Sequence, residues 1–311
     1  MIGGIVIRRV LRAMLTMFLV VTFAFFVLRL TGDPVSAMMP DDTDPAIMEQ
    51  MREDWGLNRP LAEQYVDYWW RLVQGDFGNA FRDGRPALEI VGERIPATLK
   101  LTLSGFAFIV LVGFPLGILA AVNRGSPMDR AIMTISVTGF SLPNFFLGIL
   151  LILIFSVQLR WLPAFGSERW YHLLMPVFTL GTAGAAVIAR FVRSSMLEVL
   201  NAPYIRAARA RGMPERAIVW RVALPNAAIP SITVLGFMVG ALISGSIVTE
   251  TVFAWPGIGR LLIDSVAQRE LAIVQTIVML TALSMVVANL TVDLLYLVID
   301  PRQRYATGTG E

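Results

Sequence analysis

The chain has 311 residues, of which 56% are hydrophobic and 16% are charged, with a formal net charge of +3. The charged fraction of 16% is below the roughly 25% of an ordinary soluble domain, and the mean hydropathy is +0.65. Together these values argue against an ordinary soluble domain. The absence of cysteine excludes disulfides and thiolate metal sites, and the single histidine, His172, excludes most histidine-based metal sites. The one lysine, Lys100, follows no glycine-rich run, which excludes the phosphate-binding loop of nucleotide triphosphatases.

Long uncharged apolar runs dominate the chain. A bilayer core of about 30 Å requires about 20 mostly apolar residues in a helix. The sequence therefore predicts an all-α polytopic membrane protein with six transmembrane helices. These are expected near residues 10–30, 98–122, 131–159, 173–192, 229–248 and 273–299.

The arginines predict the orientation of these helices. With the N-terminus inside, the inside segments carry fourteen arginines and five acidic residues, whereas the outside segments carry ten and seventeen. Because positive residues near span ends stay on the cytoplasmic side, both termini are predicted to be cytoplasmic. The expected organisation is a cytoplasmic N-terminus with the first helix, an extracytoplasmic cap, a five-helix transmembrane core and a cytoplasmic tail, over residues 1–30, 31–97, 98–299 and 300–311. The cap is interpreted either as a lid over the span ends or as a partner contact.

The longest predicted cytoplasmic loop, residues 193–228, contains signals for two helices. Asn201 and Pro203 are start signals, and Gly212 is a stop signal. Pro214 and Glu215 suit the first turn of a following helix. The loop is therefore expected to form a helix, a glycine turn and a second helix.

The first of these helices has the composition of a docking element. Ala207 and Ala208 leave a thin surface that another protein can approach closely, while Arg206, Arg209 and Arg211 offer charge to an acidic rim. Composition alone favours a simpler interpretation, in which the arginines fix the topology and alanine is present for its helix propensity.

The loop resembles a motif of ABC importer permeases, which is written E-A-A, three residues, G, nine residues, I, one residue, L-P. The residues at these spacings are Arg206, Ala207, Ala208, Gly212, Val222, Leu224 and Pro225. Arg206 stands in place of the glutamate and Val222 in place of the isoleucine. An arginine at this position is similar to what is found in the dipeptide/oligopeptide/nickel branch of the family, and the resemblance is to the first permease subunit of that branch.

Resemblance to that branch covers nearly the whole chain. The runs that carry it include Gly32-Asp33-Pro34, Gly75-Asp76-Phe77-Gly78, Ser141-Leu142-Pro143-Asn144-Phe145, Glu250-Thr251-Val252-Phe253-Ala254-Trp255-Pro256-Gly257 and Asp300-Pro301-Arg302. The resemblance implies a transmembrane permease subunit of an ATP-driven, binding-protein-dependent importer in a bacterial or archaeal plasma (inner) membrane.

The resemblance also implies partners and a division of labour. The expected partners are a second homologous permease, two cytoplasmic ATPase subunits, an extracytoplasmic substrate-binding protein and the lipid bilayer. Nucleic acid is not an expected partner. The chain itself is expected to be non-catalytic, without cofactor or metal, since ATP and Mg²⁺ would bind to the ATPases. The implied coupling residues are Arg206, Ala207, Ala208, Arg209, Gly212, Val222, Leu224 and Pro225. A di- or oligopeptide or similar small zwitterion is the expected substrate, with glutathione, nickel chelates and opines left open.

Five residues are candidates for the translocation path or its gate: Pro143, Asn144, Phe145, Glu250 and Asp293. Pro143 and Asn144 interrupt the third apolar run and free backbone polar groups. An ionised carboxylate such as that of Asp293 has a high free energy inside a span, and residues of this kind are often functional. A packed kink and a helix-interface hydrogen bond are the simpler interpretations. The small residues from Gly181 to Ala186 are interpreted as helix packing.

Two other classes of protein are weighed against the importer. A proton-coupled secondary transporter needs intramembrane ionisable residues, for which Asp293 alone qualifies. A membrane protease would use Ser244 or Ser246 as nucleophile and His172 as base. Their predicted depths in the bilayer disagree, which argues against such a site.

Overall fold

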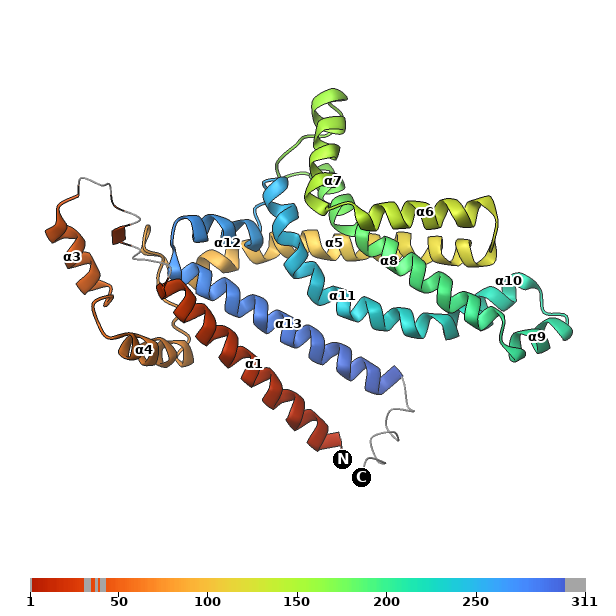
Figure 1. The fold of residues 1–311 in the computed structure, drawn as a ribbon, viewed down its shortest axis with the longest axis horizontal. Coiled ribbons are helices and arrows are strands. Elements are labelled where there is room, and N and C mark those ends of the chain that lie inside the picture. The colour runs from red at the N-terminus through yellow and green to blue at the C-terminus, as the bar shows by residue number, and fades with distance from the viewer. Residues whose placement is uncertain (1, 31–34, 37–38, 40–42, 300–311) are drawn as a thin grey trace. The chain divides into compact units, whose positions relative to one another are not determined.

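The computed structural model describes residues 2–30, 35–36, 39 and 43–299. Every long element in this part of the chain is a helix, as expected, and the only β-type pairing in it is an isolated bridge between Asn79 and Pro86. The helices shown in Figure 1 are α1 (Ile2–Leu30), α3 (Pro45–Asp54), α4 (Leu61–Val73), α5 (Ala87–Val122), α6 (Pro127–Ser141), α7 (Asn144–Leu151), α8 (Leu174–Leu200), α9 (Pro203–Ala210), α10 (Glu215–Ala217), α11 (Leu224–Val252), α12 (Ile258–Ala267) and α13 (Leu271–Ile299). Short π-helical segments η1 (Ile152–Gln158) and η3 (Ile218–Ala223) and a 3₁₀ turn η2 (Trp170–Leu173) complete the set.

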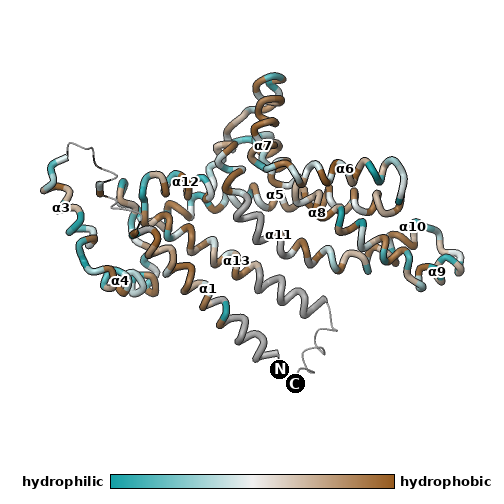
Figure 2. The backbone as a smooth tube through the Cα atoms, in the orientation of Figure 1, coloured by the Kyte–Doolittle hydropathy of each residue, from teal (hydrophilic) through white to brown (hydrophobic). Residues whose placement is uncertain are grey.

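Among the described residues, four helices are long and apolar enough to cross a membrane. They cover Ala87–Val122, Trp170–Leu200, Glu215–Gly236 and Leu271–Ala288, and Figure 2 shows hydrophobic residues along them. A shorter apolar stretch, Met14–Val27, lies within α1. Each of these five segments overlaps one of the expected spans.

The third expected span, residues 131–159, is not one straight helix. It consists of Pro127–Ser141 and Asn144–Gln158, bent by 102°. Leu142 is extended, with ψ 123°, as is typical of a residue that precedes proline. Pro143 then has no N–H to continue the α6 hydrogen-bond ladder, so the helix ends and α7 begins in a new direction.

The described residues form two compact units. One comprises the described residues up to Ala97 together with Pro256–Val286, and the other comprises Thr98–Trp255 and the described residues from Val287 onward. The first unit has a core in which the segment around Ala80 and the start of α5 pack against the start of α13. The buried members of this core are Ala80, Ala87, Ile90, Val91, Ile273 and Ile277. In the same unit, the hydroxyls of Thr22 and Tyr65 share a 2.7 Å hydrogen bond that ties α1 to α4.

The second unit is organised around α8. A Cβ on Gly117 of α5 would lie 2.7 Å from the carbonyl oxygen of Ala189, so only glycine allows this close approach of the two helices. From the α8 side, a Cβ on Gly181 or Gly184 would collide with Phe108 or Ile109 of α5. The interpretation of the small-residue run from Gly181 as a packing surface is confirmed.

Candidate coupling interface

The predicted loop of residues 193–228 is mostly helical. Helix α8 continues to Leu200 and α10 begins at Glu215, so residues 201–214 alone connect them (Figure 1). Pro203 is the first residue of α9, as expected. The prediction of Asn201 as a start signal is wrong, because its side chain donates a 2.8 Å hydrogen bond to the Leu197 carbonyl and so caps the end of α8.

Helix α9 has one face turned toward its own chain. Ile205 and Ala208 are 0% and 2% exposed, and α9 packs against η3. Arg206, Ala207 and Arg209 are exposed. Ala208 was expected to offer a thin surface to a partner, but the helical period places it one turn after Ile205 on the buried face. Of the two alanines, only Ala207 is accessible on this chain.

Gly212 ends α9 in the manner expected. Its φ of +79° lies in the left-handed region, and its N–H donates to the Arg209 carbonyl at 2.9 Å. A Cβ at this position would meet no atom within 4 Å. The requirement for glycine is therefore one of backbone conformation rather than of space.

Arg209 is paired within the chain. Its Nε and Nη2 donate to the two carboxylate oxygens of Glu215 at 2.6 and 3.3 Å, and these hydrogen bonds raise the pKa of Arg209 above its ordinary value. The pair bridges the Gly212 turn. Arg206 and Arg211, also expected to meet an acidic rim, are exposed and form no ion pair within the described residues.

The remaining motif residues lie where η3 becomes α11. Val222 and Leu224 are half-buried and Pro225 is exposed. Because Pro225 has no N–H, the carbonyl four residues earlier loses its α-helical partner, and the adjacent π-helical turn accommodates this gap. Two exposed aromatic side chains, Tyr204 on α9 and Trp220 on η3, were missed, although their aromatic character within an arginine-rich loop is a usable signal.

An ion pair that the sequence does not reveal fixes the neighbouring turn. Arg193 of α8 donates through Nε and Nη2 to the two oxygens of Asp129 at 2.6 and 2.8 Å. Asp129, which is buried, also accepts a 2.9 Å hydrogen bond from the Gly125 N–H. The start of α6 is therefore held against α8 close to the end that leads into α9.

The gate candidates are only partly brought together. Pro143, Asn144 and Phe145 lie at the start of α7, which packs against α11, the helix that carries Glu250. Glu250 is fully buried and its Oε1 accepts a 2.8 Å hydrogen bond from the Thr98 hydroxyl. Asp293 belongs to α13, but its side chain is outside the described residues, as is that of Ser244. Within the described residues, no group of three or more His, Asp or Glu side chains is placed to hold a metal ion.

Comparisons with known proteins cover most of the chain. Residues 113–305 match the family described as "Binding-protein-dependent transport system inner membrane component", and residues 2–102 match its N-terminal counterpart. The glutathione transport system permease protein GsiC of Escherichia coli (strain K12) is 44% identical over 301 residues, which cover 96% of this chain and 98% of that protein. The secondary-transporter alternative finds no support in these matches.

Two solved structures share the fold. The MetNI methionine ABC transporter, in an inward-facing conformation, aligns with a TM-score of 0.59 and 22% identity over 68% of this chain and 97% of its own. An amino acid ABC transporter crystallised with histidines aligns at 0.51 and 20% identity, over 69% and 94%. The chain therefore belongs to the binding-protein-dependent transport system inner membrane components, and it is a non-catalytic permease subunit of an ABC importer.

Proposed function

We propose that this permease couples ATP hydrolysis on separate ATPase subunits to uptake of a short peptide or a similar small zwitterion. The observation that carries the proposal is α9, a short helix with an exposed outer face, anchored on η3 by Ile205 and Ala208 and ended by the Gly212 turn. An exposed helix that is fixed to its own chain can transmit the movement of a partner as a rigid body.

The proposed coupling site comprises the exposed residues of α9 with the η3–α11 junction behind them. Arg206 and Ala207 would contact an ATPase subunit, while Arg209, Gly212 and Ala208 would keep α9 in place. Val222, Leu224 and Pro225 would support the helix from the start of α11. Each of the two ATPases, with its bound ATP and Mg²⁺, would seat one permease of a homologous pair.

The proposed topology has six spans with both termini in the cytoplasm, so that α9 faces the ATPases. It counts α1 as the first span and the bent pair α6 and α7 with η1 as the third. The excess of arginine in the inside segments supports this orientation. Residues 31–97 would then form the extracytoplasmic cap that meets a substrate-binding protein, and residues 98–299 the core.

A relative supports the proposed substrate class. GsiC is a glutathione transport permease, and glutathione is a small charged peptide-like molecule, which supports a peptide or similar zwitterion here. We propose Pro143, Asn144, Phe145, Glu250 and Asp293 as candidates for the path or gate. The contact between α7 and α11 supports the placement of the first four around one region.

Co-purification tests the coupling proposal. The tagged chain, extracted in mild detergent with its importer, should bring down ATPase subunits, and Ala207→Arg should abolish this. Ala267→Arg, at an exposed alanine on α12, is the matched control and should leave the complex intact. Equal recovery of ATPase with both variants would contradict the assignment of α9.

A further inference from the structure

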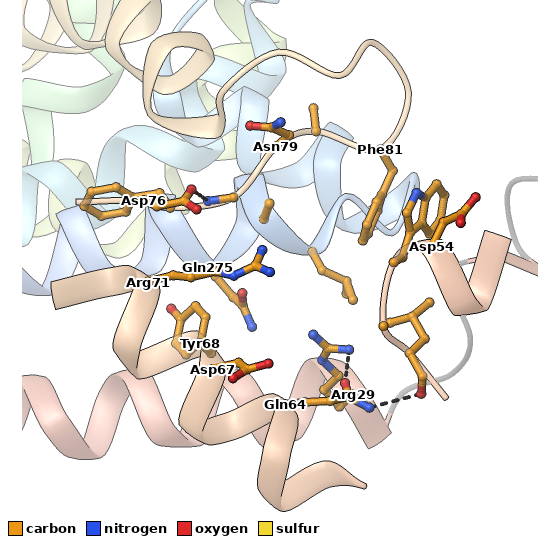
Figure 3. Close-up of a pocket in the computed structure, with 18 of the residues that line it drawn as sticks. Arg29, Asp54, Gln64, Asp67, Tyr68, Arg71, Asp76, Asn79, Phe81 and Gln275 are labelled. Carbon is orange, nitrogen blue, oxygen red and sulfur yellow. Dashed lines mark hydrogen bonds between the residues drawn. The ribbon is translucent and has the colours of Figure 1, made fainter. Parts of the chain in front are cut away.

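A cavity of about 500 Å³ lies inside the first compact unit, far in sequence from the coupling loop. Its walls come from the end of α1, from α4, from the segment of residues 76–84 and from the first turns of α13 (Figure 3). We call it the cap cavity. A volume of this size accommodates a small molecule of the size of a short peptide.

Unsatisfied hydrogen-bond donors face the cap cavity. Gln275 of α13 is only 7% exposed, yet its Nε2 has no hydrogen-bond partner among the described residues. The Nε of Arg29 is likewise buried without a partner, although another nitrogen of this guanidinium donates to Gln64. Buried donors are almost always paired in native proteins, so these two are available to an acceptor that enters the cavity.

Arg71 adds a free positive charge to the same lining. Its guanidinium projects from α4 into the cavity in Figure 3, and it forms no ion pair within the described part of the chain. Tyr68 of the same helix remains a neutral hydroxyl, because burial raises its pKa to about 12. The available groups are therefore hydrogen-bond donors, two of them cationic.

Three acidic residues of the lining, Asp54, Asp67 and Asp76, form no ion pair with Arg29 or Arg71 within the described residues. Asp67 is paired with Arg59 at 3.0 Å, and Asp76 accepts a 2.9 Å hydrogen bond from the Gly78 N–H. Asp54 lies at the edge of the cavity beside Phe81 (Figure 3). An anionic group would thus meet Arg71, Arg29 and Gln275 without displacing an existing ion pair.

The wall opposite α4 is rigidly held. The carboxylate of Glu270, buried at the start of α13, accepts hydrogen bonds from the N–H groups of Phe81 at 2.7 Å and Arg82 at 3.0 Å. The ring of Phe81 stacks on Trp55 with centroids 4.2 Å apart. This wall is therefore in place before any ligand arrives, which lowers the entropic cost of binding.

We propose that the cap cavity binds the carboxylate of a short peptide, with Arg71 and Gln275 as its principal donors and Arg29 as a supporting one. Arginine suits this role because its guanidinium forms two parallel charge-assisted hydrogen bonds with a carboxylate. The inference rests on the proposed substrate class, and it assigns a substrate subsite to the place where the proposed cap meets the end of α1 and the start of α13.

Calorimetric titration of the full chain in nanodiscs with triglycine, and with triglycine amide as the matched ligand lacking the carboxylate, tests this. Triglycine should bind, and the amide should bind about tenfold more weakly or worse, as expected for the loss of a charge-assisted contact. Arg71→Gln and Gln275→Leu should each weaken triglycine binding to a similar degree. Arg82→Gln, at an exposed arginine that does not line the cavity, should bind like the wild type.

The comparison of the two ligands on the wild-type chain requires no variant to fold. Equal affinity for acid and amide, the absence of binding, or unchanged binding in both Arg71→Gln and Gln275→Leu would overturn the inference. Co-purification of ATPase subunits is a separate readout. If the wild-type chain recovers no ATPase subunit, the proposed function is contradicted. If it recovers ATPase but does not bind triglycine, only the proposed binding site in the cap cavity is contradicted.

Discussion

Arg193 and Asp129 face each other across α8 and α6 as a bidentate ion pair, although 64 positions separate them in the chain. The Asp129 carboxylate is also the acceptor for the Gly125 N–H, so one buried group closes the α5–α6 turn and fixes it to α8. The geometry of the turn and the direction in which α8 enters the coupling loop are thereby linked.

Replacement of Arg193 by glutamine should destabilise the chain by about 1–3 kcal/mol, because it leaves a buried carboxylate with weaker partners. Thermal unfolding of the detergent-purified importer measures this. Arg130→Gln is the control, since the guanidinium of Arg130 is exposed and makes only a 3.3 Å hydrogen bond to the Gly125 carbonyl. A similar fall in melting temperature for both variants would argue against a special role for the ion pair.

Substitution at Gly212 should uncouple ATP hydrolysis from transport. Gly212→Val forces a β-branched residue to a φ of +79°, a strain of about 1–3 kcal/mol, and should shift or fray α9. Gly212→Asn is the matched control, because asparagine tolerates this conformation. Uptake per ATP hydrolysed in proteoliposomes is the measurement, and equal coupling in both variants would show that the turn is not required.

The contact between α5 and α8 predicts opposite outcomes for two glycines of one helix. Gly117→Ala should destabilise by about 1–3 kcal/mol, because its Cβ would lie 2.7 Å from the Ala189 carbonyl oxygen. Gly92→Ala, where a Cβ meets nothing within 4 Å, should be neutral or stabilise by up to about 1 kcal/mol through helix propensity. The measurement is the melting temperature of each variant in detergent. A higher melting temperature for Gly117→Ala than for the wild type would refute the packing argument.

The Glu270 carboxylate should control the local stability of the cap. Glu270→Ala removes the acceptor of two backbone N–H groups and should destabilise the segment around Phe81 by about 1–3 kcal/mol. Hydrogen exchange should accelerate at Phe81 and Arg82. Glu89→Gln breaks only an exposed ion pair with Arg85 and should leave exchange at both amides unchanged. Unaltered exchange in Glu270→Ala would mean that other contacts hold the segment.

Local signals predicted the elements well, and long-range contacts account for what they missed. Pro203 and Gly212 encode the limits of α9 through their own backbone preferences, and Pro143 encodes a break in the third apolar run. The size of the bend, 102°, depends on what α7 packs against, which no local pattern contains.

The side chains of the candidate sites were harder to predict. The helical period puts Ala208 and Ile205 on one face of α9. That this face is buried depends on its contact with η3, which the sequence does not indicate. Arg209 looked available because Glu215 lies beyond the glycine turn that brings the two together. The cap cavity depends on the meeting of Arg29, Arg71 and Gln275 from three separate helices, and nothing in the spacing of these residues indicates it.

The burial of Ala208 has a genetic consequence. A larger side chain there, as in Ala208→Leu, would collide with neighbours in its own chain, because the 2% exposure of Ala208 leaves almost no area for another protein. Selection for revertants of such a variant should therefore return second-site changes in residues 218–223 of the same gene, rather than allele-specific suppressors in the gene of an ATPase partner.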